Sequence, residues 1–190
     1  MKIYIPKDIL SVSKEFSKFK TPEVRSAGFT EQSGQERGKG DLYDTVAGLM
    51  LTHYLAHHKI PCKYQMALLQ GDDYDVKAND YTINIKTSGW SPKVDNFDEV
   101  KYHMAIKESE FHKLNSIYHQ IMVHLDDPHP HLHFCGWIDL KSLGSLEKNS
   151  FYSEIPNTGG SKGLWIPSYH LRSFREMIGF LRISAHIADG

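Results

Sequence analysis

Two short alternating stretches, separated by a two-residue turn, constrain the fold of this chain most strongly. Tyr74–Ala78 and Tyr81–Thr87 alternate apolar with polar residues, and Asn79-Asp80 separates them. Alternation with a period of two predicts β-strands, and a tight Asn/Asp turn joins antiparallel neighbours. We therefore predict a β-hairpin over residues 74–87, with the isoleucines of its second strand directed into a core.

The other elements follow from periodicity and from helix-stop and turn residues. We predict helices over Pro6–Phe19, Asp41–His58, Lys107–Ser116 and Tyr169–Ile183, and further strands over Cys62–Leu69, Ile117–Leu125 and His131–Ile138. The polar, glycine-rich segment Thr30–Gly40 is predicted to be a mobile loop. A helix, three strands, a helix and a strand in this order indicate an α/β fold.

The length and the charge distribution favour one domain with an acidic centre. A chain of 190 residues, 40% of them hydrophobic, can bury one sizeable core. We expect an N-terminal extension over 1–40, a core over 41–125, and an additional strand and helix over 126–190. The net charges of residues 1–40, 41–140 and 141–190 are +3, −6 and +2. Basic flanks around an acidic centre suit a cation site with phosphate-binding edges, although ordinary surface variation explains them equally well.

The cysteine count argues against a protein held together by disulfides or by a four-thiolate zinc site, and the hydropathy argues against a secreted or membrane-spanning one. Cys62 and Cys135 are the only cysteines, too few for a disulfide framework or a four-thiolate zinc site. No stretch of the sequence has the length and apolarity of a signal peptide or a membrane span. We therefore expect a cytoplasmic protein that does not associate with membranes.

The predicted hairpin carries a cluster of acidic, amide and basic side chains. Because residues two apart in a strand point the same way, Asp73 and Asp75 share one face, as do Asn84 and Lys86. Pairing of the strands would bring Asp75 next to Asn84 and Lys86. Phosphodiester hydrolysis needs such a cluster, since carboxylates hold Mg²⁺ and a lysine orients the attacking water. An exposed polar hairpin whose acids only surround a turn remains the alternative.

The helix before the hairpin adds another acid, Asp44. Spacing of three and four residues places it on the same helical face as Ala47, Leu51 and Leu55. A carboxylate on a core-facing stripe needs a cationic or metal partner. An acid in the first turn is also favoured by the helix dipole alone. We expect Asp44 to point toward the sheet that carries the hairpin.

Together these residues resemble the PD-(D/E)XK nuclease superfamily, which includes many restriction endonucleases and other DNA-cleaving or repair enzymes. The resemblance covers about Asp41–Leu125 and is strongest in the strand Ile83-Asn84-Ile85-Lys86-Thr87-Ser88. It implies a restriction-endonuclease-like αβββαβ core, with a central mixed sheet flanked by helices and with N- and C-terminal extensions. It also implies an endonuclease that cleaves DNA with Mg²⁺, or with Mn²⁺ as a substitute, in a prokaryotic or phage-infected cell.

The resemblance assigns a role to each residue of the cluster. Asp75 takes the place of the metal-binding aspartate, Lys86 that of the catalytic lysine and Asp44 that of the auxiliary acid on the first helix. Asn84 stands where the superfamily has the second metal ligand, an aspartate or glutamate. Asp73 replaces Asp75 if the register slips by two residues, or it acts as a compensating metal ligand.

The asparagine at position 84 leaves three interpretations open. An amide oxygen can ligate Mg²⁺, but it is neutral, so the site loses one negative charge. The chain is then an active variant, a catalytically inactive nuclease-fold module that binds DNA or a protein partner, or a substituted form made inactive. The resemblance also makes a homodimer that cuts two strands a natural assembly.

Two segments beside the cluster are candidates for contact with nucleic acid. Arg37 and Lys39 lie in the polar segment before the first core helix, and Ser88, Trp90 and Lys93 follow the catalytic-lysine strand. Basic and aromatic side chains in such positions can contact a DNA backbone. A plain linker explains the first segment, and burial of Trp90 explains the second, equally simply.

Histidines offer a third site. His131 and His133 would project from one strand face and, with Asp126, could hold Zn²⁺ or Fe²⁺. The alternative is a solvated strand edge, because spacing fixes no third ligand. The i+4 pair His53 and His57 lacks the glutamate of a zinc helix, so we expect it at the surface.

Overall fold

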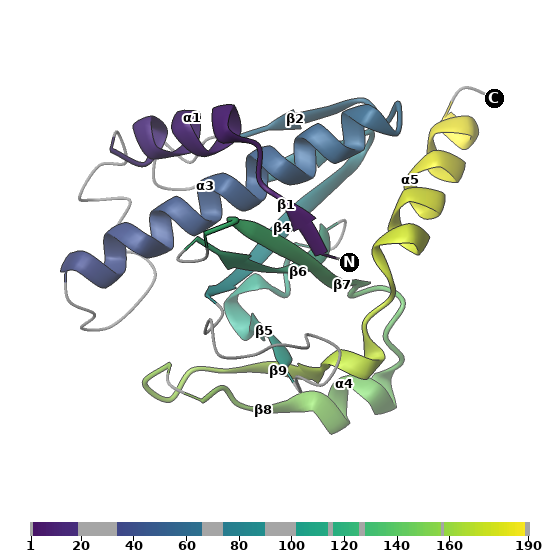
Figure 1. Cartoon of the computed structure of the whole chain (residues 1–190). Helices are drawn as coiled ribbons and strands as arrows, with labels where there is room; N and C mark the ends of the chain where they lie inside the picture. The colour runs from purple at the N-terminus through teal and green to yellow at the C-terminus, as the bar shows by residue number, and fades with distance from the viewer. Residues whose placement is uncertain are drawn as a thin grey trace.

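The computed structural model of the chain describes residues 2–18, 34–65, 74–89, 102–113, 116–125, 128–156 and 158–188. Its helices are α1 (Lys7–Lys18), α3 (Gly34–His57), α4 (Ser145–Phe151) and α5 (Phe174–Ala188), with short 3-10 helices η2 (Glu108–Glu110) and η3 (Ser168–His170). Its strands are β1 (Lys2–Tyr4), β2 (Cys62–Tyr64), β3 (Val76–Ala78), β4 (Tyr81–Gly89), β5 (His103–Lys107), β6 (Ser116–His124), β7 (His131–Asp139), β8 (Tyr152–Glu154) and β9 (Lys162–Pro167). The architecture is mixed α/β, as the sequence predicts (Figure 1).

A six-stranded mixed sheet forms the centre of the structure, in the order β1-β7-β6-β4-β3-β2. Strands β4 and β6 are parallel, from Thr82 opposite Ser116 to Gly89 opposite Val123. The other neighbouring strands of this sheet are antiparallel. A parallel pair requires a crossover connection. In the described residues this connection contains β5 and η2.

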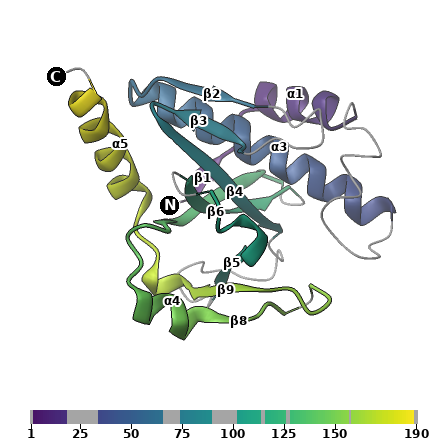
Figure 2. The same cartoon turned by 180° about the vertical axis from the view of Figure 1, so that it is seen from behind.

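A second, three-stranded sheet of order β5-β9-β8 lies apart from the helices α1 and α3, as Figures 1 and 2 show from opposite sides. Successive residues of β6 show how the two sheets are related. Ile117 is buried in the core that the central sheet shares with α3 and α5, whereas Tyr118 is buried among residues of β5 and β9. Because neighbouring strand residues point to opposite faces, the central sheet has helices on one face and the second sheet on the other.

The predicted hairpin is confirmed. Strands β3 and β4 are antiparallel, with Val76 opposite Ile83 and Ala78 opposite Tyr81. Asn79 in the turn has a φ of 50°, a left-handed conformation that asparagine tolerates better than most residues. Its side-chain amide donates a 2.9 Å hydrogen bond to the carbonyl of Leu181, which joins the turn to α5.

The predicted loop over Thr30–Gly40 is wrong for residues 34–40, which are helical. Helix α3 begins at Gly34, and Asp41 lies inside it, where its carbonyl accepts a 2.8 Å hydrogen bond from the Thr45 hydroxyl. The buried face of this helix starts only at Thr45 and Val46. Once that packed part is formed, each added turn costs little, so the helix extends through a glycine-containing segment.

The predicted helix over Lys107–Ser116 is also wrong. Residues up to Lys107 belong to β5, which pairs with β9 from His103 opposite Pro167 to Lys107 opposite Gly163. Only the turn η2 follows, and Ser116 already begins β6. Pairing with a strand more than fifty residues later overrides the local helical preference.

The remaining predicted elements are present with shifted bounds. The predicted strand Cys62–Leu69 is described as β2, ending at Tyr64, and residues 66–70 lie outside the described residues. The last helix begins at Phe174 rather than Tyr169, after Ser173 and Glu176 cap each other's backbone N–H groups at 3.3 and 2.7 Å. None of the described helices combines the length and apolarity that a membrane crossing requires.

Candidate functional site

Strand β4 divides the predicted site residues between two sides. Ile83 is buried in the core with α3, so the alternating Asn84 and Lys86 point to the opposite face. There Asn84 lies beside Tyr118 of β6, in the core between the two sheets. Asn84 and Lys86 therefore share a face, as the sequence predicts, and this face is the one turned toward β5 and η2.

Lys86 forms its ion pair with Glu110 of η2 rather than with Asp75. The Lys86 Nζ lies 2.8 and 2.6 Å from the two carboxylate oxygens of Glu110, and 5.6 Å from the centre of the Tyr118 ring. The same tyrosine donates a 3.0 Å hydrogen bond to the Glu110 carbonyl. The side chains of Lys86 and Glu110 are 26% and 17% exposed, so solvent reaches the pair.

Glu110 is a site residue that the sequence reasoning missed. It follows Lys86 by 24 positions, and the intervening chain passes through β5 before it returns to β4. No spacing rule links two residues across such a connection. The only signal was its place in the segment expected to be a helix between two core strands.

Asn84 is buried, at 5% exposure, and its two polar atoms differ in their surroundings. Its Oδ1 accepts a hydrogen bond from the Lys113 Nζ at 3.4 Å. Its Nδ2 has no hydrogen-bond partner among the described residues. An asparagine ligates a cation through its oxygen, and here that oxygen faces an ammonium group. The surroundings of Asn84 therefore disfavour a metal ion and favour an acceptor for its N–H groups.

Asp75 approaches β4 at the residue between Asn84 and Lys86. Its Oδ2 accepts a 2.7 Å hydrogen bond from the backbone N–H of Ile85. Strand β3 begins only at Val76, so it offers no backbone carbonyl to the N–H of Ile85. The Asp75 carboxylate accepts that hydrogen bond instead. The acid is thus held at the point of the strand that the sequence predicts, by the backbone rather than by the lysine.

Asp44 reaches the same strand one position beyond Lys86. It is exposed on α3, unlike the buried Ala47 of the expected stripe, and its carboxylate accepts a short hydrogen bond from the Thr87 hydroxyl. Burial, opposed by a hydrogen bond with Thr45 and helped by the charges of Asp75 and Asp44, raises the pKa of the nearby Tyr64 to about 12. The Tyr64 ring lies directly against Gly48 of α3. Both carboxylates are therefore close to one hydroxyl on the helix side of β4.

Two of the carboxylates near β4 are possible metal ligands. Within the described parts of the chain, no three His, Cys, Asp or Glu side chains lie close enough together to hold one. Asp75 and Asp44 have the oxygen ligands that Mg²⁺ prefers. Asn84 does not fit that role, because its oxygen accepts a hydrogen bond from the Lys113 ammonium group.

Several predicted residues cannot be placed. Asp73, Trp90, Lys93 and Asp126 lie outside the described residues, and only the backbone of Arg37 and Lys39 is described, in α3. The hydroxyl of the remaining candidate, Ser88, accepts a 3.0 Å hydrogen bond from the side chain of Gln120.

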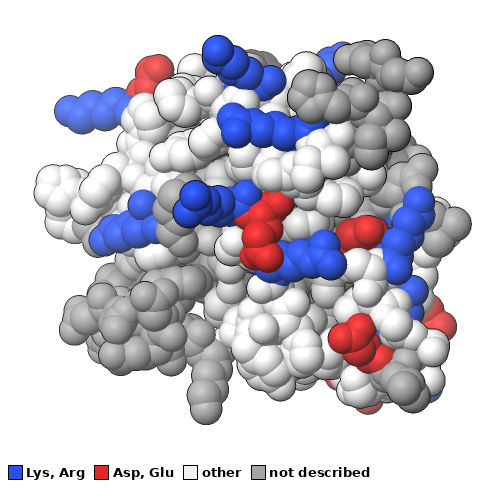
Figure 3. Space-filling view, turned by 90° about the vertical axis from the view of Figure 1, so that its right-hand side faces the viewer, with Lys and Arg blue, Asp and Glu red and all other residues white. Residues whose placement is uncertain are grey.

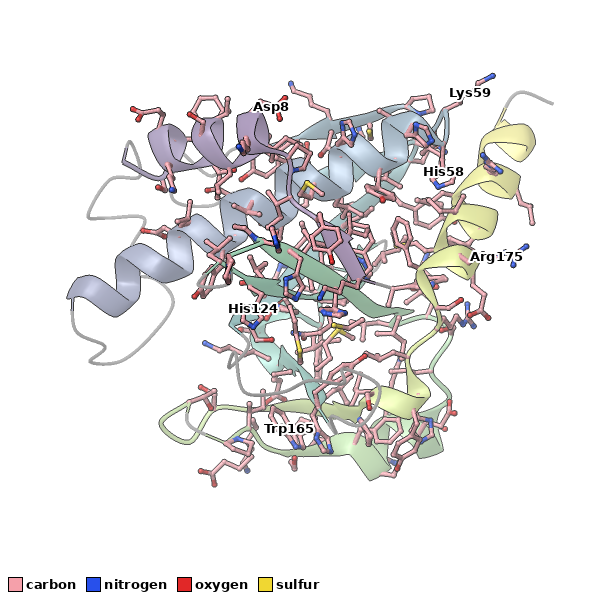
Figure 4. All side chains as sticks on the ribbon, viewed as in Figure 1. Asp8, His58, Lys59, His124, Trp165 and Arg175 are labelled. Carbon is pink, nitrogen blue, oxygen red and sulfur yellow. The ribbon has the colours of Figure 1, made fainter. Side chains whose placement is uncertain are left out.

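The histidines of β7 do not form a solvated strand edge. His131 and His133 are buried at 5% and 8% exposure, and His124 of β6, at 4%, stacks on His131 with ring centres 4.8 Å apart. Burial, and next the charge of His131, lower the pKa of His133 to about 4. His124 lies on the central sheet (Figure 4). The sequence missed it because it stands on a neighbouring strand. His53 and His57 are exposed, as expected.

A cavity of about 220 Å³ lies elsewhere, between α4 and the second sheet. It is lined by Phe111, Leu140, Lys141, Lys148, Asn149, Tyr152 and Leu164. None of these residues is among those that the sequence singled out.

Comparison with known proteins gives no relative for this chain: no family model, curated protein or solved structure matches it. The function therefore has to be argued from the geometry of β4 and its surroundings.

Proposed function

We propose that this chain acts on DNA as a metal-dependent endonuclease of the PD-(D/E)XK kind. One observation carries the proposal: the Asp75 carboxylate is bound to the backbone of Ile85, between Asn84 and Lys86. This hydrogen bond holds a carboxylate next to the strand that bears the expected catalytic lysine. Asp44, bound to Thr87, supplies a second carboxylate next to the same segment.

The order of the elements supports the proposal as well. Helix α3 precedes the antiparallel strands β2, β3 and β4, and β6 then runs parallel to β4. The αβββαβ core has this succession, with a helix between its third and fourth strands. In the described part of that connection, β5 and η2 stand instead.

The chemistry divides between the two sides of β4. Asp75 and Asp44 would hold Mg²⁺, or Mn²⁺ in its place, and the bound ion would polarise the scissile phosphate and make a water molecule more acidic. Lys86 would stabilise negative charge on the phosphate oxygens. For that role its ammonium group has to turn from Glu110 toward the substrate, which its partial exposure allows.

The surface charge does not by itself identify a substrate. On the face shown in Figure 3, Lys and Arg side chains are interspersed with Asp and Glu. The described residues therefore form no continuous basic surface for a phosphate backbone on this face.

Nicking of supercoiled plasmid DNA in Mg²⁺ and in Mn²⁺ tests the proposal. We expect the native chain to nick, and Asp75→Asn and Lys86→Met each to lower the rate on the order of 100-fold. Asp80→Asn and Lys77→Met, at exposed positions of the same hairpin, serve as matched controls and should leave the rate unchanged. Nicking that both active-site variants retain in full would refute the assignment.

A second candidate is a nuclease-like module that binds DNA without cutting it. The observation in its favour is the neutral Asn84, whose oxygen already accepts from Lys113. A native chain that binds a DNA duplex but does not nick, together with nicking by Asn84→Asp, would favour this function. Restored nicking would show that only the missing charge prevents catalysis.

A further inference from the structure

We infer that Asn84, Lys113 and Lys86 form a site for one phosphodiester group of a nucleic acid, so that position 84 contacts substrate rather than metal. The inference rests on the proposed function for the identity of the ligand. It assigns to Asn84 the opposite role from that implied by the sequence resemblance, in which this position holds a cation.

The side chain of Asn84 supplies the first argument. It is 5% exposed, and its Nδ2 has no hydrogen-bond partner among the described residues. A buried donor without an acceptor destabilises the fold, so such a group calls for an explanation. Exchanging the amide atoms does not remove the problem, because the nitrogen would then face the ammonium of Lys113. An acceptor oxygen from a ligand satisfies the donor and leaves the contact with Lys113 intact.

The local charge supplies the second argument and defines the ligand. Two ammonium groups, those of Lys86 and Lys113, lie on this side of β4, and Glu110 contacts the first of them. Ammonium groups beside an unsatisfied amide donor suit an anion with acceptor oxygens, such as a phosphodiester. A cation would meet two ammonium groups and one carboxylate there, and Coulomb repulsion opposes its binding.

The third argument concerns access. The side chain of Lys86 is 26% exposed, so a ligand can reach its ammonium end from solvent. Lys113 contacts Asn84 through a flexible four-carbon chain, which can adjust to a ligand while its ammonium group stays beside the amide oxygen. We therefore expect a phosphate oxygen to approach the amide from the side of Lys86.

Binding in the absence of metal tests the inference directly. Fluorescence anisotropy in EDTA would measure the affinity for a labelled DNA duplex and a labelled RNA of the same sequence, with inorganic phosphate as competitor. We expect Lys113→Met and Asn84→Asp each to weaken binding about 10-fold, because each removes a charge-assisted contact or adds a like charge. Lys77→Met and Asn149→Asp make the same changes elsewhere on the described surface and should shift the affinity less than twofold.

The outcomes separate this inference from the proposed hydrolysis. Loss of metal-free binding in both variants supports the site even if no variant nicks plasmid. Unchanged metal-free affinity in both variants overturns the site even if the native chain nicks. Electron paramagnetic resonance measures Mn²⁺ binding by Asn84→Asp. If this variant binds Mn²⁺ more tightly than the native chain while its DNA affinity in EDTA is unchanged, residue 84 is a metal ligand and the inference is overturned. If Lys113→Met does not fold, as judged by circular dichroism, Lys113→Gln takes its place.

Discussion

On its α3 side, strand β4 meets two carboxylates, Asp75 at the backbone of Ile85 and Asp44 at Thr87. On its β5 side, the same stretch of strand meets two lysines and one carboxylate, gathered around Asn84. The two sides are separated by the thickness of one strand but carry different groups. A strand can therefore present carboxylates and ammonium groups at successive residues, because alternation sends neighbours to opposite faces.

The difference changes how the motif is interpreted. A pattern of aspartate, asparagine and lysine suggests one cluster when it is laid out on a hairpin. The structure distributes it over two sides, and each side obtains partners from elsewhere in the chain. Glu110 and Lys113 come from the segment after β5, and Asp44 comes from α3. Under the proposed function, an ion at Asp75 and Asp44 would contact the scissile phosphate, and the phosphodiester at Asn84 would be a separate one.

The largest expected effect tests whether the α3 side is a sealed core. Burial lowers the pKa of His119 to about 4, below its ordinary 6.5, so the fold favours the neutral ring. As the pH falls, His119 therefore takes up a proton in the unfolded chain at a higher pH than in the folded chain. The contribution of the neutral ring to the free energy of unfolding is complete above pH 6.5 and decreases as the pH falls to about 4. We expect a loss of about 3 kcal/mol from this residue.

Urea unfolding at several pH values measures this loss. His119→Gln can keep a hydrogen bond to the Gly136 carbonyl but does not titrate, so it should show a flatter dependence on pH than the native chain. The matched change at the exposed His53 should leave the native dependence in place. An equal dependence in native chain and His119→Gln would mean that this side of the sheet is open to water.

A smaller effect concerns the position of Tyr64, which both acids approach. Gly48→Ala would place a methyl group into the Tyr64 ring. The strain outweighs the better helix propensity of alanine, and we expect the free energy of unfolding to fall by about 1 to 2 kcal/mol. Gly179→Ala in α5 meets nothing within 4 Å and should be stabilising or neutral. Thermal or urea unfolding measures the stability of both variants. A Gly48→Ala variant as stable as the native chain would show that the Tyr64 ring is not held against Gly48.

The smallest effect concerns the β5 side. Lys86 and Glu110 are partly exposed, so solvent weakens their attraction despite the short contact. A double-mutant cycle with Lys86→Met and Glu110→Gln should give a coupling energy of about 1 kcal/mol, which decreases in high salt. A coupling near zero would indicate that the pair is not formed in solution. A much larger value would contradict the partial exposure of the pair.

The parts of the fold that sequence predicted are those set by local periodicity. The hairpin, the packed half of α3 and the strands β6 and β7 each show their pattern within one stretch of chain. The strand β5 does not, because its partner β9 lies more than fifty residues away and no local pattern records that pairing. The helical continuation of α3 to Gly34 was hidden by glycines that usually interrupt helices.

The site was predictable to the same extent. Alternation correctly put Asn84 and Lys86 on one face, and the hairpin brought Asp75 to their strand. The partners of the lysine and the amide were not predictable, since Glu110 and Lys113 reach them through a turn between two sheets. His124 escaped notice for the same reason, as it meets His131 only through the pairing of β6 with β7.

The separation of charge across β4 is tested most directly by a crystal soaked in Mn²⁺ and measured at a wavelength where manganese scatters anomalously. We predict an anomalous peak beside Asp75 and Asp44 on the α3 side, with the Asn84 oxygen still next to Lys113. A peak within about 2.3 Å of the Asn84 oxygen, shared with Asp75, would contradict the account.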